Sequence, residues 1–139
     1  MRALVALSQC NVVFLDPDND IKPKSVREGS AKSVKYAYLR EIVDYISQGS
    51  SVIVYNHRHR KKEERYFEEF FQLFSDDAVL GDKQIIAITF PKCTIRDYFI
   101  ISANTNHASR LREAVTGFVA GPFGEAGLVK SQPNKLNSR

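Results

Sequence analysis

Two short apolar runs flank a helical pattern in the first half of the chain, and this arrangement limits the folds open to it. Residues 11–15 and 51–55 are almost entirely apolar, as expected for strands buried on both faces of a parallel sheet. Between them, apolar residues recur at helical spacing across residues 35–48, and Gly49 provides a stop. A strand, helix, strand order predicts a parallel crossover, so both strands should end at the same edge of the sheet.

The second half of the chain predicts two more helices and a pair of strands. Residues 62–75 place five aromatic side chains on one helical face, with glutamates outside it. Residues 84–90 and 96–102 read as strands, and the five residues between them are too few for a crossover helix. These strands should therefore form an antiparallel hairpin. A last helix is expected over residues 107–119, with Asn106 as its cap.

Together these elements predict an α/β fold with a small, mostly parallel sheet of about four to five strands. Helices should cover the faces, and the antiparallel hairpin should lie toward the C-terminus. The chain has 139 residues and 43% hydrophobic content, enough for one core, so residues 1–120 are expected to form a single domain. Residues 121–139 are rich in Gly, Pro, Ser and Asn and predict a flexible tail.

The cysteines and the apolar runs favour a cytoplasmic protein. Cys10 and Cys93 lie far apart, without the spacing of a redox or zinc motif, and are expected to be buried free thiols. No stretch approaches the roughly 18 to 20 apolar residues of a membrane span. Residues 3–8 could be a short helix or a leading strand, and they run only a few residues before the polar Gln9. A weak signal peptide at this end is the alternative to the favoured cytoplasmic protein.

Basic side chains are concentrated in two segments that should share one sheet edge. The net charge of +4 permits attraction to phosphate groups. One segment runs from Lys22 to Arg40 and begins within a long loop over residues 16–33 that follows the first strand. The other segment follows the second strand. We therefore expect an anionic ligand, with nucleic acid as one candidate. The residues expected to bind it are Lys22, Lys24, Arg27, Lys35, Asn56, Arg58 and Arg60, with Lys32 in the same basic segment.

Three aspartates at the end of the first strand form the first candidate site. Asp16, Asp18 and Asp20 follow an apolar strand, where ligands of open α/β sheets bind. Carboxylates in this position could hold Mg²⁺ or act in catalysis, with Asp16 and Asp18 as the catalytic pair. The alternative is a turn in which the aspartates only terminate the strand.

A His/Arg segment at the end of the second strand forms the second candidate site. His57 or His59 could act as a general base or ligate a metal, and Arg58 with Arg60 could clamp a phosphate. The alternative is a solvated basic turn. His107 stands at the start of a helix and is expected to be a surface or capping residue.

The Asp-x-Asp pattern after the first strand resembles the nucleophile motif of haloacid-dehalogenase-type phosphatases. In that family the first aspartate attacks phosphorus and the second serves as acid and base, which correspond here to Asp16 and Asp18. The sequence departs from the pattern at Asp20, where the family has Thr or Val, and at Tyr55 and Asn56, where it has Ser or Thr.

Two broader resemblances involve residues 11–75. The segment VFLDPDNDI over residues 13–21, followed by SVIVYNH over residues 51–57, resembles a family of uncharacterised prokaryotic proteins. The order of elements is similar to the C-terminal half of a class I methyltransferase-like fold, in which an Asp-Pro-Pro-Tyr type of motif stands at this strand end. Pro17 matches that motif, whereas Asp18 and Asn19 replace the second Pro and the aromatic residue.

The methyltransferase resemblance implies a partial fold. The Gly-rich loop and the acidic ribose-binding residue of such enzymes have no counterpart, so no S-adenosylmethionine site is expected in this chain. A half-sheet of this kind would expose an edge and an apolar face, and a homodimer is the partner expected to cover them.

The sequence leaves several functions open. A binding module for an anionic partner ranks first, because this function makes the fewest demands on the sequence. A Mg²⁺-dependent phosphoesterase or nuclease, using Asp16, Asp18 and His57, is the main alternative. A truncated methyltransferase-like domain that needs a partner is the third.

Overall fold

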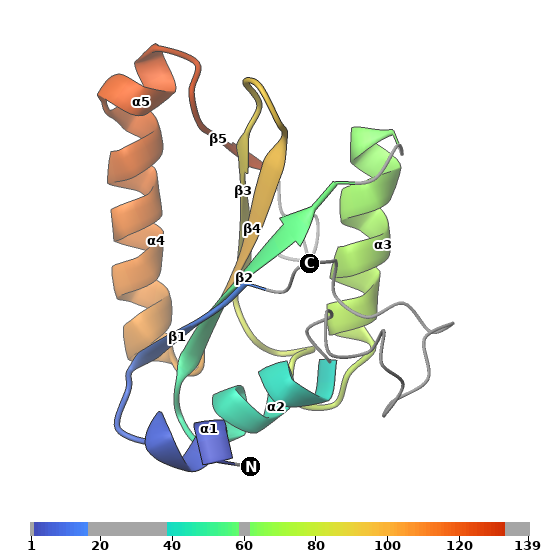
Figure 1. Cartoon of the computed structure of the whole chain (residues 1–139), viewed down its shortest axis with the longest axis vertical. Coiled ribbons are helices and arrows are strands. Elements are labelled where there is room, and N and C mark those ends of the chain that lie inside the picture. The colour runs from blue at the N-terminus through green and yellow to red at the C-terminus, as the bar shows by residue number, and fades with distance from the viewer. Residues whose placement is uncertain (1, 17–38, 59–61, 133–139) are drawn as a thin grey trace.

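A computed structural model describes residues 2–16, 39–58 and 62–132, which form a five-stranded sheet with helices on both faces (Figure 1). Helices α2 and α3 cover one face and α4 covers the other. The strands are β1 (Val12–Leu15), β2 (Ser51–His57), β3 (Ile85–Phe90), β4 (Arg96–Ile101) and β5 (Lys130–Gln132). The helices are α1 (Arg2–Ala6), α2 (Leu39–Ser47), α3 (Glu63–Ser75), α4 (Thr105–Ala120) and α5 (Pro122–Glu125).

The sheet is mixed, so the prediction of a mostly parallel sheet is wrong. The strand order is β1-β2-β4-β3-β5, and only β1 and β2 pair in parallel. The β3–β4 hairpin forms as predicted, but its second strand, β4, inserts beside β2. β3 therefore runs in the same direction as β2 with an antiparallel strand between them. Sequence spacing fixes the hairpin, but it does not say which of its strands joins the neighbouring sheet.

The predicted parallel crossover is confirmed. β1 pairs in parallel with β2 through α2, with Leu15 opposite Val54. α2 ends at Ser47, and the expected stop, Gly49, follows with a φ of 96°, in the left-handed region that glycine adopts without a steric penalty. Both β1 and β2 thus end at the same edge of the sheet.

The larger core lies between the sheet and α2 with α3. It contains one face of the sheet and the aromatic face of α3 that the sequence predicted. Phe99 of β4 is fully buried at its centre, with its ring centroid 5.1 to 6.5 Å from five aromatic rings of α3. These rings belong to Tyr66, Phe67, Phe70, Phe71 and Phe74.

A smaller core lies on the opposite face, under α4. Leu111, Val115 and Val119 recur every four residues on α4 and pack against apolar side chains of the sheet. This helix does not cover β1, where Val12 is 42% exposed and Phe14 is 55% exposed. On its α4 face, the sheet is therefore left uncovered by this helix at the edge strand β1.

Three local expectations from the sequence need correction. The cap of α4 is Asn104, whose side chain accepts from the backbone N–H of His107, so the helix begins before the expected Asn106 cap. Cys10 and Cys93 are exposed free thiols, because each stands in a connection outside the neighbouring strand. Within the predicted tail, α5 and β5 form, and β5 adds an edge strand to β3. Residues 133–139 lie outside the described residues.

Across the three described segments, no helix is both long enough and apolar enough to pass through a bilayer.

Candidate functional site

The ends of β1 and β2 bring part of the predicted site to one sheet edge. Asp16 follows Leu15 directly and is exposed, and His57 is the exposed last residue of β2. Both stand at the edge that the parallel pairing of these strands defines. The other predicted site residues of the two loops lie outside the described residues: Asp18, Asp20, Lys22, Lys24, Arg27, Lys32, Lys35, His59 and Arg60.

Arg58 is held in a buried polar cluster between the sheet and α3, which we call the Arg58 cluster. Its Nε and Nη2 donate to the two carboxylate oxygens of Asp97 at 2.8 and 2.7 Å, a bidentate pair. Its Nη1 donates to Glu63 at 2.6 Å. The side chain of Arg58 is 6% exposed and that of Asp97 is 0% exposed. Hydrogen bonds from Thr89 to Asp97, and from Lys130 and Gln132 to Glu63, complete the cluster.

Strand pairing explains why these polar groups meet. Asp97 of β4 stands opposite Asn56 of β2 and Thr89 of β3, so the three side chains share the α3 face of the sheet. All three are fully buried. Asn56 donates to the hydroxyl of Tyr66 on α3, and Arg58 lies over the rings of Tyr66 and Phe67. Asn56 and Arg58, expected to bind a ligand, are thus engaged in contacts within the fold.

The charges of the cluster stabilise one another. Burial by itself would lower the pKa of Arg58, but hydrogen bonds and charge attraction from Asp97 and Glu63 raise it above its ordinary value. Burial likewise would raise the pKa of Glu63, but hydrogen bonds from Lys130, Gln132 and Arg58 outweigh it and lower the pKa to about 2. The guanidinium of Arg58 and the carboxylate of Glu63 are therefore charged at neutral pH.

The lowered pKa of Glu63 predicts a loss of stability in acid. A carboxyl with a lower pKa in the folded state stabilises that state above its ordinary pKa of 4.5, and this contribution disappears as the pH falls toward about 2. Unfolding by urea at a series of pH values should show wild type more stable than Glu63→Gln at pH 6, with the two converging near pH 2. A constant difference across this range would contradict the pairing.

A row of aromatic rings crosses the opposite face of the sheet, and we call it the aromatic row. Its rings are exposed toward the two ends and half-buried at Tyr55, Tyr98 and Phe90. It runs from Phe14 of β1 through Tyr98 of β4, Phe90 of β3 and Phe118 of α4 to Phe123 of α5, with successive ring centroids 5.4 to 6.2 Å apart. Tyr55 of β2 lies beside this series, with its ring centroid 5.4 Å from that of Tyr98. Phe14 is 55% exposed at one end and Phe123 is 53% exposed at the other. The members are Phe14, Tyr55, Tyr98, Phe90, Phe118 and Phe123.

Basic side chains border the aromatic row at the strand ends. His57 is opposite Arg96 in the β2–β4 pairing, and both are exposed. Each stands two residues from a tyrosine of the row, Tyr55 or Tyr98, and therefore on the same face of the sheet. Lys92, in the β3–β4 turn, is also exposed and donates to the carbonyl oxygen of Ala126 beyond α5.

Sequence reasoning missed the aromatic row because its members are scattered along the chain. Phe14, Tyr55, Phe90 and Tyr98 stand in four separate strands, each of which looks like buried core when taken alone. Only strand order and register bring them together. The alternation within β4, where Arg96 and Tyr98 share one face and Asp97 and Phe99 the other, was the available signal.

No cluster of three His, Cys, Asp or Glu side chains with metal-binding geometry occurs within residues 2–16, 39–58 and 62–132. Two of the three aspartates expected to hold Mg²⁺, Asp18 and Asp20, lie outside this part of the chain.

Comparison with protein-family models, with curated proteins and with solved structures found no match to this chain.

Proposed function

We propose that the protein binds single-stranded nucleic acid along the aromatic row. The observation that carries this proposal is the continuous series of five rings, with Tyr55 beside it, exposed at both ends and bordered by basic side chains. Every base has a flat π face, so the exposed rings toward the ends of the row can accept bases without regard to sequence. Unstacked bases of a single strand can reach such rings, whereas the paired bases of a duplex are already stacked.

The charge of the protein also supports nucleic acid as the partner. The chain carries a net charge of +4, and Arg96 stands on the same face of the sheet as the rings, where a phosphate backbone would pass. Arg58 has no part in this proposal, because Asp97 and Glu63 already neutralise it inside the fold. In this proposal the anionic partner expected from the sequence binds on the α4 face of the sheet.

Fluorescence anisotropy with a labelled oligothymidine of about ten nucleotides tests the stacking. Phe14→Ala should weaken binding by about 5- to 150-fold, the equivalent of about 1–3 kcal/mol for one stacked base. Phe14 is 55% exposed, so its truncation leaves the core intact. Phe14→Tyr retains the ring and should bind like wild type. Equal affinities for all three proteins would contradict the proposal.

The salt dependence of oligothymidine affinity tests the electrostatic contribution to binding. Arg96→Gln should reduce the slope of log affinity against log salt by about 0.7, the value for one phosphate contact to a single strand. The matched control is Arg65→Gln, because Arg65 is 79% exposed on α3, on the opposite face of the sheet. The control should keep the wild-type slope. Equal losses in both variants would indicate nonspecific attraction to a basic protein.

A further inference from the structure

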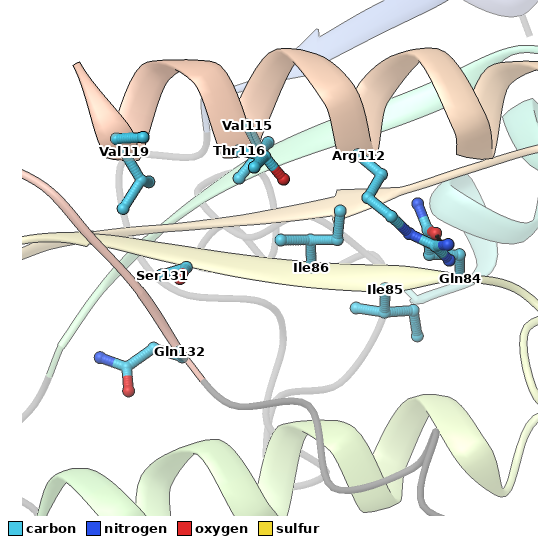
Figure 2. A pocket seen from close by; sticks show the side chains of 10 residues that line it. Gln84, Ile85, Ile86, Arg112, Val115, Thr116, Val119, Ser131 and Gln132 are labelled. Carbon is cyan, nitrogen blue, oxygen red and sulfur yellow. Dashed lines mark hydrogen bonds between the residues drawn. The ribbon is translucent and has the colours of Figure 1, made fainter. Parts of the chain in front are cut away.

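A second surface, separate from the aromatic row, lies where α4 passes the end of β5. β5 pairs with only part of β3, from Ala87 to Thr89, so the first residues of β3 extend beyond it. A groove of about 410 Å³ opens there between α4 and the two strands (Figure 2). No residue that lines this groove belongs to the aromatic row.

The middle of the groove is apolar. Ile86 points from β3 toward α4, and Val115 and Val119 come down from the helix to meet it (Figure 2). Ala120 adds a small side chain at the C-terminal end of α4. Pockets that bind small molecules share this construction, with volumes of roughly 300 to 1,000 Å³, apolar walls and a few polar groups that orient the ligand.

A single cation stands at one end of the groove. Arg112 of α4 lies beside Gln84, and its Nη2 donates to the Oε1 of that side chain (Figure 2). Gln84 is held in turn, because its Nε2 donates to the carbonyl oxygen of Ala108 at 3.0 Å and to Ser102 at 3.4 Å. The groove has no acidic side chain among its lining residues. The guanidinium therefore stands against a neutral, fixed partner, with its positive charge uncompensated by the groove wall.

From this arrangement we infer that the groove binds a monocarboxylate with an apolar body. The carboxylate pairs with Arg112, whose planar guanidinium has five N–H donors, more than its contact with Gln84 uses. The apolar body lies along Ile86, Val115 and Val119. An anion without such a body would leave the apolar walls in water, and a neutral molecule of the same shape would lose the charge-assisted hydrogen bonds.

Titration of the full chain with octanoate, followed by the methyl NMR signals of Ile86, Val115 and Val119, tests this inference. We expect saturable shifts of these signals with octanoate, and much weaker effects with acetate or octanol. Arg112→Gln should weaken octanoate binding by about tenfold or more, because a charge-assisted hydrogen bond is lost. The matched control is Arg110→Gln, an exposed arginine of the same helix that does not line the groove, and it should bind like wild type.

Blocking the groove provides an independent variant. Ala120 is exposed at the end of α4, so the Ala120→Leu variant should fold. The larger side chain should fill part of the apolar groove, and octanoate binding should be lost. Octanol binding as tightly as octanoate, or Arg110→Gln weakening binding as much as Arg112→Gln, would overturn the inference. Wild type without saturable methyl shifts would overturn it as well.

Discussion

Asp97→Asn is expected to lower the free energy of unfolding by about 3 kcal/mol. The substitution removes the bidentate partner of Arg58, whose side chain is only 6% exposed, and leaves its charge buried. Loss of one partner of a buried ion pair typically costs about 3–5 kcal/mol. We expect the lower end of this range because Glu63 still pairs with the guanidinium at 2.6 Å. Urea unfolding at pH 7 measures the change.

The control for this variant changes the same chemical group on the surface. Asp82 has a side chain that is 78% exposed and pairs with Lys83 at 3.4 Å. Asp82→Asn should alter the free energy of unfolding by no more than about 0.5 kcal/mol, since exposed ion pairs contribute little. An Asp97→Asn protein as stable as this control would mean that the Arg58 cluster does not hold the strand ends together.

Phe99→Ala is expected to remove about 3–5 kcal/mol of stability, the usual cost of deleting a large buried aromatic side chain. Phe99 is fully buried, and five rings of α3 surround it. The cavity would lie between the sheet and α3, where the surrounding rings can collapse only partly. The free energy of unfolding of a small domain is only about 5–15 kcal/mol in total. Chemical denaturation should therefore show an unfolding midpoint shifted strongly toward low denaturant concentration.

Phe14→Ala provides the comparison for that loss. The same chemical group is deleted, but at a position that is 55% exposed. We expect a change of about 0.5 kcal/mol or less in the free energy of unfolding, as for other surface substitutions. A large loss from Phe14→Ala would place this ring in a packed interface, formed for example by a second copy of the chain. Phe14→Ala thus separates a role of this ring in binding from a role in stability, because the variant should bind the oligonucleotide more weakly while its free energy of unfolding is retained.

The sequence predicts most of the local structure of this chain because apolar residues recur with the spacing of a helix or a strand, and residues such as Gly49 mark where an element ends. The aromatic stripe of α3 and the five-residue link between β3 and β4 both determine local conformation. The sheet order is different, since it depends on which strand of the hairpin reaches β2. Apolar runs that are equally suitable for parallel and antiparallel neighbours do not contain that information.

The candidate site was harder to predict for a related reason. Asp16 and His57 stand at one sheet edge because β1 and β2 are parallel, which the crossover pattern foretold. Arg58, which looked like a ligand-binding cation, faces Asp97 from a strand about forty residues later. That contact depends on the β2–β4 pairing. The aromatic row likewise depends on register, so neither feature follows from residue types near Asp16 or His57.

The Arg58 cluster and the aromatic row occupy opposite faces of the same strands. Along β4, Asp97 and Phe99 point toward α3, whereas Arg96 and Tyr98 point toward the α4 face. The buried side therefore fixes the positions from which the exposed rings project. Rigid presentation matters for stacking, because rings that are already ordered lose little conformational freedom when a base is added.

The most direct test of the proposed function is a map of the surface that an oligothymidine touches on the ¹⁵N-labelled protein. At 15.8 kDa the chain is suited to amide NMR spectroscopy. Titration should shift the amide signals of Phe14, Phe90, Arg96 and Tyr98, while those of Arg65, Glu68 and Gln72 on α3 stay in place. Shifts confined to α3, or no shifts at low salt, would contradict the assignment of nucleic-acid binding to the aromatic row.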